Sequence, residues 1–233
     1  MKVTSSKVYA LLLTLLALVE MLLPSAPLFA QPDHEPHAAS DTLRHRPMTL
    51  DERLLFGINQ WGEQAAWLDP PAHVLSNTAS IVVLTPPVAL YGIGLLTKNT
   101  HDTWAGAAMT LSEVTSGLLV EGIKAIVQRP RPFHVIDGVR QPDTLTGGYS
   151  FPSGHAAATW GLATGLSLHY PKWYVVGPSF LYATVVSLSR PYLSVHYPSD
   201  IFIGAILGSL VSYLFYREEP KLFPNAGRIV NPR

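Results

Sequence analysis

The chain has 233 residues, a formal net charge of zero and a charged-residue content of 14%, well below the roughly 25% of ordinary soluble domains. This length fits one domain, and the low charge content favours a protein that faces lipid. The balanced charge argues against a nucleic-acid partner, because no basic face is available to neutralise phosphates. The chain has no cysteine, which excludes disulfides, thiolate metal sites and a cysteine nucleophile.

Residues 1–30 are predicted to be a signal peptide or a first membrane helix. Lys2 and Lys7 precede an apolar run that begins at Tyr9 and leads to small residues, an order typical of a secretory signal. Leu28 stands where a small residue would suit cleavage better, so both outcomes stay open. In either case the two lysines are expected to stay inside and the following chain to emerge outside.

Residues 31–48 are polar, contain proline and histidine, and show no apolar period, which predicts an exposed linker. Their histidines, His34, His37 and His45, could suggest a metal site, but a solvated tail is the preferred interpretation. Residues 49–69 are predicted to form an amphipathic helix.

That helix is expected to begin at a capping box of Thr49 and Glu52 and to end at Asp69. Its apolar stripe comprises Leu54, Ile58, Trp61, Ala65 and Leu68. The stripe would let the helix lie flat on a membrane surface or pack on the rest of the protein, and the sequence does not choose between the two.

Five apolar stretches follow, each near the roughly 17–25 residues that a spanning helix needs. They are residues 79–97, 103–123, 154–170, 173–189 and 200–216. They predict an all-α, membrane-embedded bundle of five spanning helices, or six if the first segment is retained. The core would cover residues 73–217, with a tail over 218–233. A soluble all-helical domain is the alternative.

Two of these stretches contain interruptions. Pro86 and Pro87 lie in the first, which neighbouring helices can tolerate. Glu113 and Glu121 lie in the second and cannot face lipid cheaply, so both are expected to face the bundle. Glu121 is three residues from Lys124 and is expected to pair with it.

Three short segments collect most of the unusual residues: 124–132, 152–155 and 189–200. Alternation of the predicted helices, supported by the positive residues of the C-terminal tail, puts the outer end of one helix at each segment. Residues 98–102 and 217–233 would lie inside, and residues 124–153 outside. The three segments are therefore predicted to meet at one membrane face.

The residue types in these segments suit a tetrahedral anion. Lys124, Arg131 and Arg190 supply three cations, and arginine matches phosphate oxygens in geometry as well as charge. Ser153 and Gly154 precede a helix, whose first N–H groups point at an anion. Cations and amides arranged in this way stabilise the negative charge on the oxygens of a transferred phosphoryl group. Each of these residues alone is common as a membrane anchor or a helix cap. Their occurrence together, in this order and at one membrane face, indicates an anion-binding site.

Two histidines flank this anion site. Asp200 follows His196 by four residues and could accept the proton of one ring nitrogen, which leaves the other nitrogen free to attack phosphorus. His155 would then protonate the leaving group and activate water. In this scheme the cations take the place of a metal, so no metal and no cofactor are expected.

The pattern Lys-x6-Arg-Pro, Pro-Ser-Gly-His and Ser-Arg-x5-His-x3-Asp resembles the signature of the phosphatidic acid phosphatase type 2 family, within the superfamily of acid phosphatases and vanadium haloperoxidases. The motifs span about 100 residues, and every position matches. The resemblance implies that His196 is the nucleophile, Asp200 its partner and His155 the acid/base. It also implies that the phosphate is held by Lys124, Arg131, Ser153, Gly154 and Arg190.

The function expected from this resemblance is a lipid phosphatase that works through a phosphohistidine at the outer face of a bacterial inner membrane. A soluble periplasmic acid phosphatase and a vanadium-dependent haloperoxidase are the alternatives. Phosphatidic acid, phosphatidylglycerol phosphate, undecaprenyl pyrophosphate and lipid A phosphates are all candidate substrates. In the loop 133–151, His134 and Arg140 would either touch a head group or face solvent. The oligomeric state cannot be read from the sequence.

Overall fold

Every regular element in residues 47–142 and 147–222, the ranges that the computed structural model describes, is a helix. The all-α class predicted from the sequence is confirmed. The predicted signal or first helix at 1–30, residues 31–46 of the linker and residues 223–233 of the tail lie outside the described ranges.

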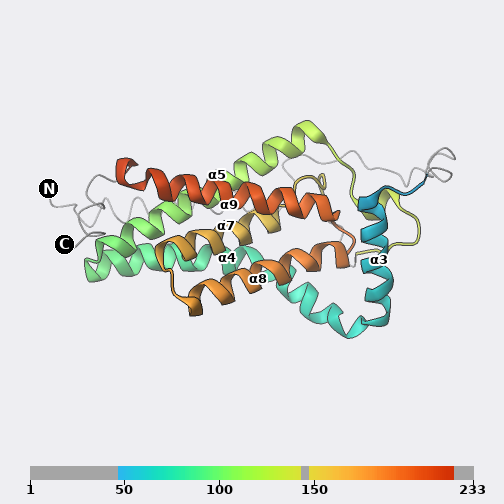
Figure 1. The fold of residues 1–233 in the computed structure, drawn as a ribbon, viewed down its shortest axis with the longest axis horizontal. Coiled ribbons are helices and arrows are strands. Elements are labelled where there is room, and N and C mark those ends of the chain that lie inside the picture. Colours follow the sequence, from blue (N-terminus) through green and yellow to red (C-terminus); the bar gives the residue numbers. More distant parts are fainter. Residues whose placement is uncertain (1–46, 143–146, 223–233) are drawn as a thin grey trace.

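The helices follow one another through short connections (Figure 1). In chain order they are α3 (Leu50–Gln64), the 3₁₀ turn η1 (Ala66–Leu68), α4 (Asp69–Thr97), α5 (Thr100–Val127), α6 (Pro132–Val135), α7 (Gly154–His169), α8 (Trp173–Tyr192) and α9 (Pro198–Leu222). The five apolar stretches correspond to α4, α5, α7, α8 and α9. Most of these helices are longer than predicted.

The junction between α3 and α4 differs from the prediction. The first helix ends at Gln64 rather than Asp69, and Pro70 and Pro71 stand in the first turn of α4 instead of closing the helix before it. Proline is tolerated there because the N–H groups of a first helical turn have no partner within the helix. Pro86 and Pro87 lie inside α4, which continues through them as a helix.

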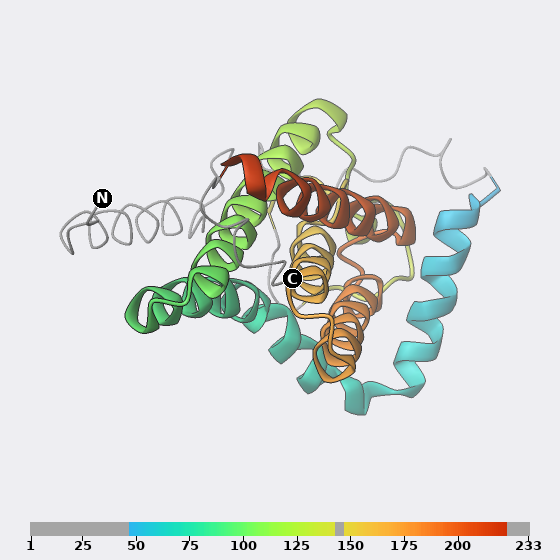
Figure 2. The same cartoon turned by 60° about the vertical axis from the view of Figure 1, so that its left-hand side comes forward.

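Helix α7 is the centre of the bundle, where it contacts α4, α5, α8 and α9 (Figure 2). Its approach to α9 is close: a Cβ at Gly208 would lie 1.8 Å from the carbonyl oxygen of Ala157, and one at Gly204 would lie 2.4 Å from that of Ser153. Small residues allow such backbone contact between helices. The two glycines therefore set α9 directly against the beginning of α7.

Two described segments are long and apolar enough to cross a membrane: residues 66–97, which form η1 and α4, and helix α9. Large apolar side chains also point outward from several helices, among them Leu96, Ile126 and Phe202. A membrane-embedded bundle accounts for such an exterior. The number of spanning helices stays a prediction.

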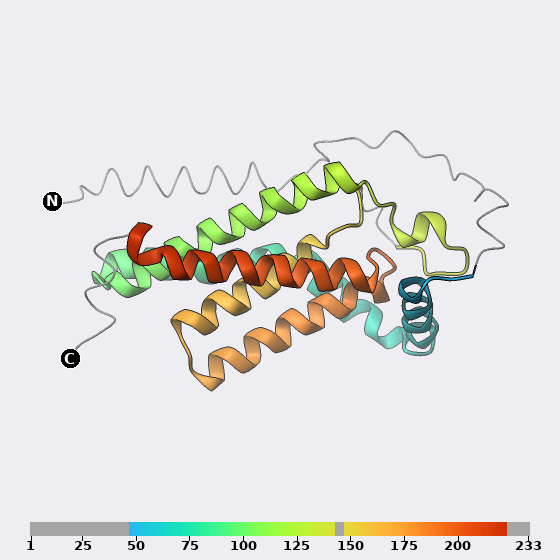
Figure 3. The same ribbon diagram turned by 45° about the horizontal axis from the view of Figure 1, so that its top comes forward.

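Helix α3 lies across one end of the bundle (Figures 1 and 3). The predicted capping box of Thr49 and Glu52 is present, and Ala65, Ile58 and Leu68 of the predicted stripe pack on the core, but its other two residues do not. Leu54 and Trp61 are 50% and 58% exposed, whereas Leu55 is fully buried in a cluster with the end of α8. The helix therefore packs on the bundle through the face of Leu55, and its apolar outer face remains exposed.

The two glutamates of α5 differ from each other. Glu113 is 8% exposed, which confirms that it faces the bundle. The side chain of Glu121 is 63% exposed, so the same prediction was wrong for that residue. Its pairing with Lys124 is confirmed, since Lys124 Nζ donates a hydrogen bond of 2.7 Å to Glu121 Oε1. This residue sits near the end of α5, where an ion pair can reach solvent.

Candidate active site

The three motif segments meet at the end of the bundle that α3 covers (Figure 3). The amide of Ser150 donates to the carbonyl of Arg129 at 2.8 Å, and the amide of Ser153 donates to the carbonyl of Asp200 at 3.0 Å. These two bonds join the loop before α7 to the segment after α5 and to the first turn of α9. The clustering predicted from the sequence is thus found in the fold.

His196 lies in the turn between α8 and α9 and is 3% exposed. Its Nδ1 lies 2.7 Å from the carbonyl oxygen of Ser150. A carbonyl can only accept a hydrogen bond, so this contact places the ring proton on Nδ1 and leaves the lone pair on Nε2. Burial, together with the positive charges of Arg131, Arg190 and Lys124, lowers the pKa of His196 well below its ordinary value. The ring is therefore a neutral base with Nε2 available.

Asp200 lies beside His196, but the ring proton is bonded to the carbonyl of Ser150 and not to this carboxylate. Its Oδ2 is 3.6 Å from Nδ1 of His196, beyond a normal hydrogen bond, and it accepts from the amide of Tyr197 at 2.8 Å instead. The carboxylate is fully buried and its Oδ1 lies 2.6 Å from Nη1 of Arg129. Asp200 thus acts on His196 through the turn that carries the ring and through its charge.

Arg129 is a site residue that the sequence analysis missed. Besides Asp200, its Nη2 pairs with Asp51 Oδ2 of α3 at 2.7 Å, and its guanidinium lies 3.7 Å from the centre of the Tyr197 ring. Asp51 also accepts a hydrogen bond of 3.0 Å from the amide of Ser199. Burial alone would raise the pKa of Asp51, but the hydrogen bonds from Ser199 and Arg129 outweigh it and lower that pKa. Through this network α3 fastens the first turn of α9.

Arg131 binds the loop and the histidine together. It is 4% exposed, and burial lowers its pKa to about 10. Its guanidinium donates to the carbonyls of Gly147, Gly148 and Val195 at 2.9, 3.1 and 2.8 Å. Nη1 also lies 3.4 Å from Nε2 of His196. Because a guanidinium can only donate, this contact is a long hydrogen bond from Arg131 to the unprotonated Nε2.

Arg190 has an unused donor. Its Nη1 donates a short hydrogen bond to Oγ of Ser76 in α4, but its buried Nε has no partner among the described residues. A buried donor without a partner costs free energy unless a ligand or water satisfies it. Nε of Arg190 therefore suits a phosphate oxygen. Ser76 is a second residue that the sequence analysis missed.

His155 opens α7 close to the same serine. Its Nε2 lies 3.1 Å from the carbonyl oxygen of Ser76, which assigns the proton to Nε2 and leaves Nδ1 for proton exchange. Arg190 and His155 are thus both positioned by one residue of α4.

The remaining predicted phosphate ligands are near the start of α7 and the end of α5. Ser153 caps α7, because its Oγ accepts from the amide of Ala156 at 3.4 Å. A Cβ at Gly154 would meet only Val120, at 3.6 Å, so packing within the protein does not itself demand a glycine. The first amides of α7 have no earlier helical carbonyl to bind. They remain suited to an anion. The positive charge of Lys124 acts on the same site, since it helps to lower the pKa of His196.

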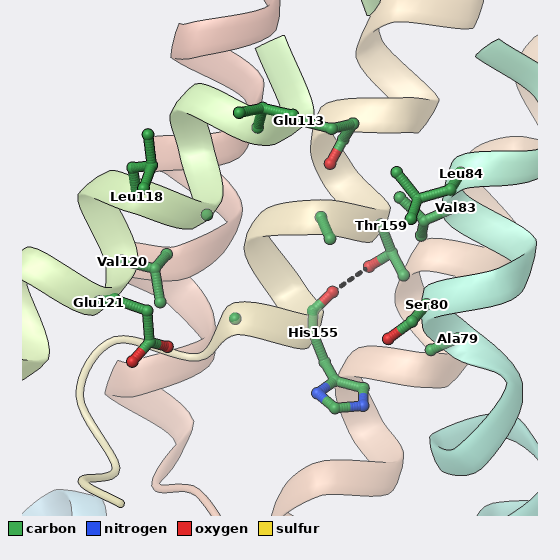
Figure 4. Close-up of a pocket in the computed structure, with 14 residues that line it drawn as sticks. Ala79, Ser80, Val83, Leu84, Glu113, Leu118, Val120, Glu121, His155 and Thr159 are labelled. Carbon is green, nitrogen blue, oxygen red and sulfur yellow. Dashed lines mark hydrogen bonds between the residues drawn. The ribbon is translucent and has the colours of Figure 1, made fainter. Parts of the chain in front are cut away.

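An apolar groove begins at His155. It has a volume of about 240 Å³ and runs between α4 and α5 over the face of α7 (Figure 4). Its lining is mainly aliphatic: Ala79, Val83, Leu84, Leu118, Val120 and Ala158. Glu113 lies at its far end in the same view. The histidine therefore stands between the cations Arg190, Lys124 and Arg131 and an apolar groove.

For Arg140 the sequence analysis left two roles open, contact with a head group or exposure to solvent. In the structure Arg140 pairs with Asp69 at 2.6 Å and lies over the ring of Tyr192. No group of three or more acidic or histidine residues within 47–142 and 147–222 is placed to hold a metal ion. The histidines His34, His37 and His45 lie outside those ranges. A metal-independent reaction stays a prediction.

The arrangement has the parts of a phosphoryl-transfer site: a neutral imidazole nitrogen, buried cations, a helix N-terminus and a second histidine with a free nitrogen. Buried cations attract the negative charge of a phosphoryl group more strongly than they would in water, because the dielectric constant inside the protein is low. The geometry provides an attacking atom, charge stabilisation and a proton carrier.

Comparisons with known proteins agree with this chemistry. The family model described as PAP2 superfamily matches residues 103–223. An undecaprenyl-diphosphatase of Sulfolobus acidocaldarius is 36% identical over 152 residues, which cover 65% of this chain and 70% of that protein. A lipid A 1-phosphatase of Rhizobium etli is 31% identical over 119 residues, 49% of this chain and 50% of that protein. The crystal structure of Aquifex aeolicus LpxE superposes with a TM-score of 0.62 and 27% identity, over 73% of this chain and 96% of that one. The chain belongs to the PAP2 superfamily.

Proposed function

We propose that this protein is a membrane lipid phosphatase that hydrolyses a phosphomonoester or pyrophosphate through a phosphohistidine on His196, without a metal. The observation that carries the proposal is the position of His155, which lies within the field of the cations Arg190, Lys124 and Arg131 and also lines the apolar groove. A substrate with a phosphate head and an apolar chain satisfies both surfaces at once.

In the first step Nε2 of His196 attacks phosphorus while the bond to the leaving oxygen breaks. The nitrogen is neutral and unprotonated, since Nδ1 carries the ring proton and donates it to the carbonyl of Ser150. Arg131, Arg190 and the first amides of α7 stabilise the charge on the phosphoryl oxygens. His155, in its imidazolium form, gives the proton of Nδ1 to the departing alkoxide. A bound phosphate dianion favours that charged form.

In the second step water attacks the phosphohistidine. His155, now neutral, takes one proton from the water as the bond between nitrogen and phosphorus breaks, and His196 regains its lone pair. The imidazolium of His155 is thereby restored, so both steps balance over one cycle. Inorganic phosphate then leaves the cationic pocket.

A lipid substrate is favoured over a soluble phosphoester. The groove that begins at His155 has a mainly aliphatic lining, which offers a soluble sugar or nucleotide few hydrogen bonds. Relatives named for undecaprenyl diphosphate and lipid A support the same substrate class. We further propose that the site faces the periplasm of a bacterial inner membrane, as the alternation of helices from an N-terminal segment with Lys2 and Lys7 inside predicts.

The test is phosphate release by the purified, detergent-solubilised protein. The panel contains phosphatidic acid, phosphatidylglycerol phosphate, undecaprenyl pyrophosphate and a lipid A phosphate, with p-nitrophenyl phosphate as the soluble comparison. The proposal predicts that at least one lipid is turned over with a much higher kcat/KM than the soluble ester. Equal or better turnover of the soluble ester would contradict a lipid phosphatase.

A further inference from the structure

Glu113 is a buried carboxyl that the catalytic scheme does not use. It is 8% exposed, and it forms no hydrogen bond or ion pair with any residue in the described ranges. It lines the groove that begins at His155, and Figure 4 shows its carboxyl directed from α5 into the space between α5 and α4. A polar group in such a place requires a partner or carries a cost.

The packing around Glu113 makes room for this side chain. A Cβ at Gly161 of α7 would lie 2.8 Å from Oε1 of Glu113, so the glycine leaves the space that the carboxyl occupies. The opposite helix α4 forms no hydrogen bond with it: Val83 and Leu84 are aliphatic, and the hydroxyl of Ser80 does not bond to Glu113. The carboxyl is therefore accommodated without being satisfied, and the open side of the groove is where a partner can approach.

Its depth in the groove can be given from the helix geometry. Glu113 is level with Gly161, which follows His155 by six residues; at 1.5 Å per residue the separation along α7 is about 9 Å. On the side of α5 and α7 the wall between them offers no free side-chain donor: Val120 and Ala158 are aliphatic, and the hydroxyl of Thr159 already donates to the carbonyl of His155 at 2.8 Å. A chain that leaves the phosphate would pass the hydroxyl of Ser80 on the α4 side and then meet the unpaired carboxyl of Glu113 deeper in the groove.

We infer that Glu113 binds a neutral hydrogen-bond donor, a hydroxyl or amide N–H, on the chain of the lipid substrate. The inference rests on the proposed function and narrows its substrate class. An extended chain advances about 1.1–1.2 Å per bond, since one residue of three bonds spans about 3.3–3.6 Å. The donor therefore lies about eight bonds from phosphorus. Lipid phosphates that carry a hydroxyl or amide at that depth are preferred over those with a plain hydrocarbon chain.

The preference has a physical cause in the unpaired carboxyl. A carboxylate accepts a hydrogen bond and a neutral carboxyl can do so as well, so a donor in the chain satisfies either form. A plain hydrocarbon chain would close the groove and seal the carboxyl from water without replacing its partners. One such bond corresponds to a preference of about tenfold.

The experiment compares three synthetic substrates with the purified full-length protein: dodecyl phosphate, 6-hydroxydodecyl phosphate and 2-hydroxydodecyl phosphate. In the 6-hydroxy compound the hydroxyl oxygen is eight bonds from phosphorus. We expect kcat/KM for it to exceed that for dodecyl phosphate by about tenfold, and the 2-hydroxy compound to gain little. The Glu113→Leu variant should lose the advantage of the 6-hydroxy compound, whereas Glu113→Gln, which can still accept, should keep most of it. Ser80→Ala, which removes a different polar group from the groove, should leave the ratio unchanged.

The ratio of kcat/KM within each variant is the readout, so a partly impaired protein still reports. Thermal unfolding confirms that each variant is folded. Equal rates for the three compounds in the wild type, or an unchanged advantage in Glu113→Leu, would overturn the inference while leaving a lipid phosphatase in place. Failure of the wild type to release phosphate from any of these compounds or from the lipid panel would instead overturn the proposed function, and the inference with it.

Discussion

The ring of His196 is held by a main-chain carbonyl rather than by a carboxylate: its Nδ1 lies 2.7 Å from the oxygen of Ser150. Such a bond fixes the tautomer and the ring orientation through a neutral acceptor. Asp200, at 3.6 Å, is committed to Arg129 and to the amide of Tyr197. The structure therefore separates orientation of the ring, which Ser150 provides, from support of the turn, which Asp200 provides.

The first prediction is that His196 stays neutral at mildly acidic pH. Burial and the neighbouring cations lower its pKa well below 6.5, so its Nε2 lone pair should persist between about pH 7.5 and 5.5. Nitrogen-15 NMR of the histidine rings, with His196→Asn to assign the signal, measures this directly. A midpoint near 6.5 for that ring would contradict the buried cationic environment.

The second prediction concerns the pair of Arg129 and Asp200. Removing the cation leaves a fully buried carboxylate, so Arg129→Gln should lower the free energy of unfolding by about 3 kcal/mol. This is the lower end of the range for buried pairs, because the arginine side chain is 27% exposed. Unfolding by SDS in mixed micelles gives the value. Arg53→Gln, at an exposed position of α3, is the matched control, and an equal effect in both variants would refute the role of Arg129.

The third prediction tests the link between α4 and the phosphate pocket. Ser76→Ala removes the hydroxyl that accepts from Arg190 but keeps the main-chain carbonyl near His155. We expect kcat/KM to fall about tenfold, as for the loss of one buried hydrogen bond to a charged group. In Thr78→Val the lost hydroxyl bonds only within α4, to Val74, and activity should hardly change. Equal activity of the two variants would show that Ser76 does not position Arg190.

The fourth prediction is that activity survives EDTA and is inhibited by vanadate, because Lys124, Arg131 and Arg190 supply the positive charge that stabilises the transferred phosphoryl group. Phosphate release is measured before and after chelation, and with increasing vanadate. Loss of activity in EDTA that a divalent ion restores would refute a metal-independent reaction.

Part of this site could be predicted from the sequence because the motifs lie at helix ends. Successive helices that run in opposite directions bring Arg131, His155 and His196 to the same end of the bundle. The apolar stretches of the sequence predict that alternation of direction. The register of α3 could not be predicted, because Leu54 and Leu55 are both apolar and only packing on α8 selects the second.

Other contacts left no local signal. Asp51 looked like an ordinary first-turn acid of α3, yet it reaches Arg129 and Ser199. Ser76 lies within a long apolar helix, and its role depends on Arg190, 114 residues away. The proximity of His196 and Asp200 in sequence suggested a direct bond, but the turn between them directs the carboxylate to the amide of Tyr197. Contacts of this kind are fixed by tertiary packing.

The division of labour between the histidines follows from their free nitrogens. His155→Ala removes proton transfer, which is worth roughly 10²–10⁴ in rate for a poor leaving group. With p-nitrophenyl phosphate the first step needs little help, so this variant should accumulate the covalent intermediate while its hydrolysis stays slow. His196→Ala should form none.

Rapid-quench trapping with a ³²P-labelled substrate tests the central claim, that His196 is the nucleophile, most directly. The account predicts an acid-labile, base-stable phosphohistidine in the wild type, more of it in His155→Ala, and no covalent phosphate in His196→Ala. Covalent phosphate on the His196→Ala protein, or none on a wild type that turns over, would contradict it.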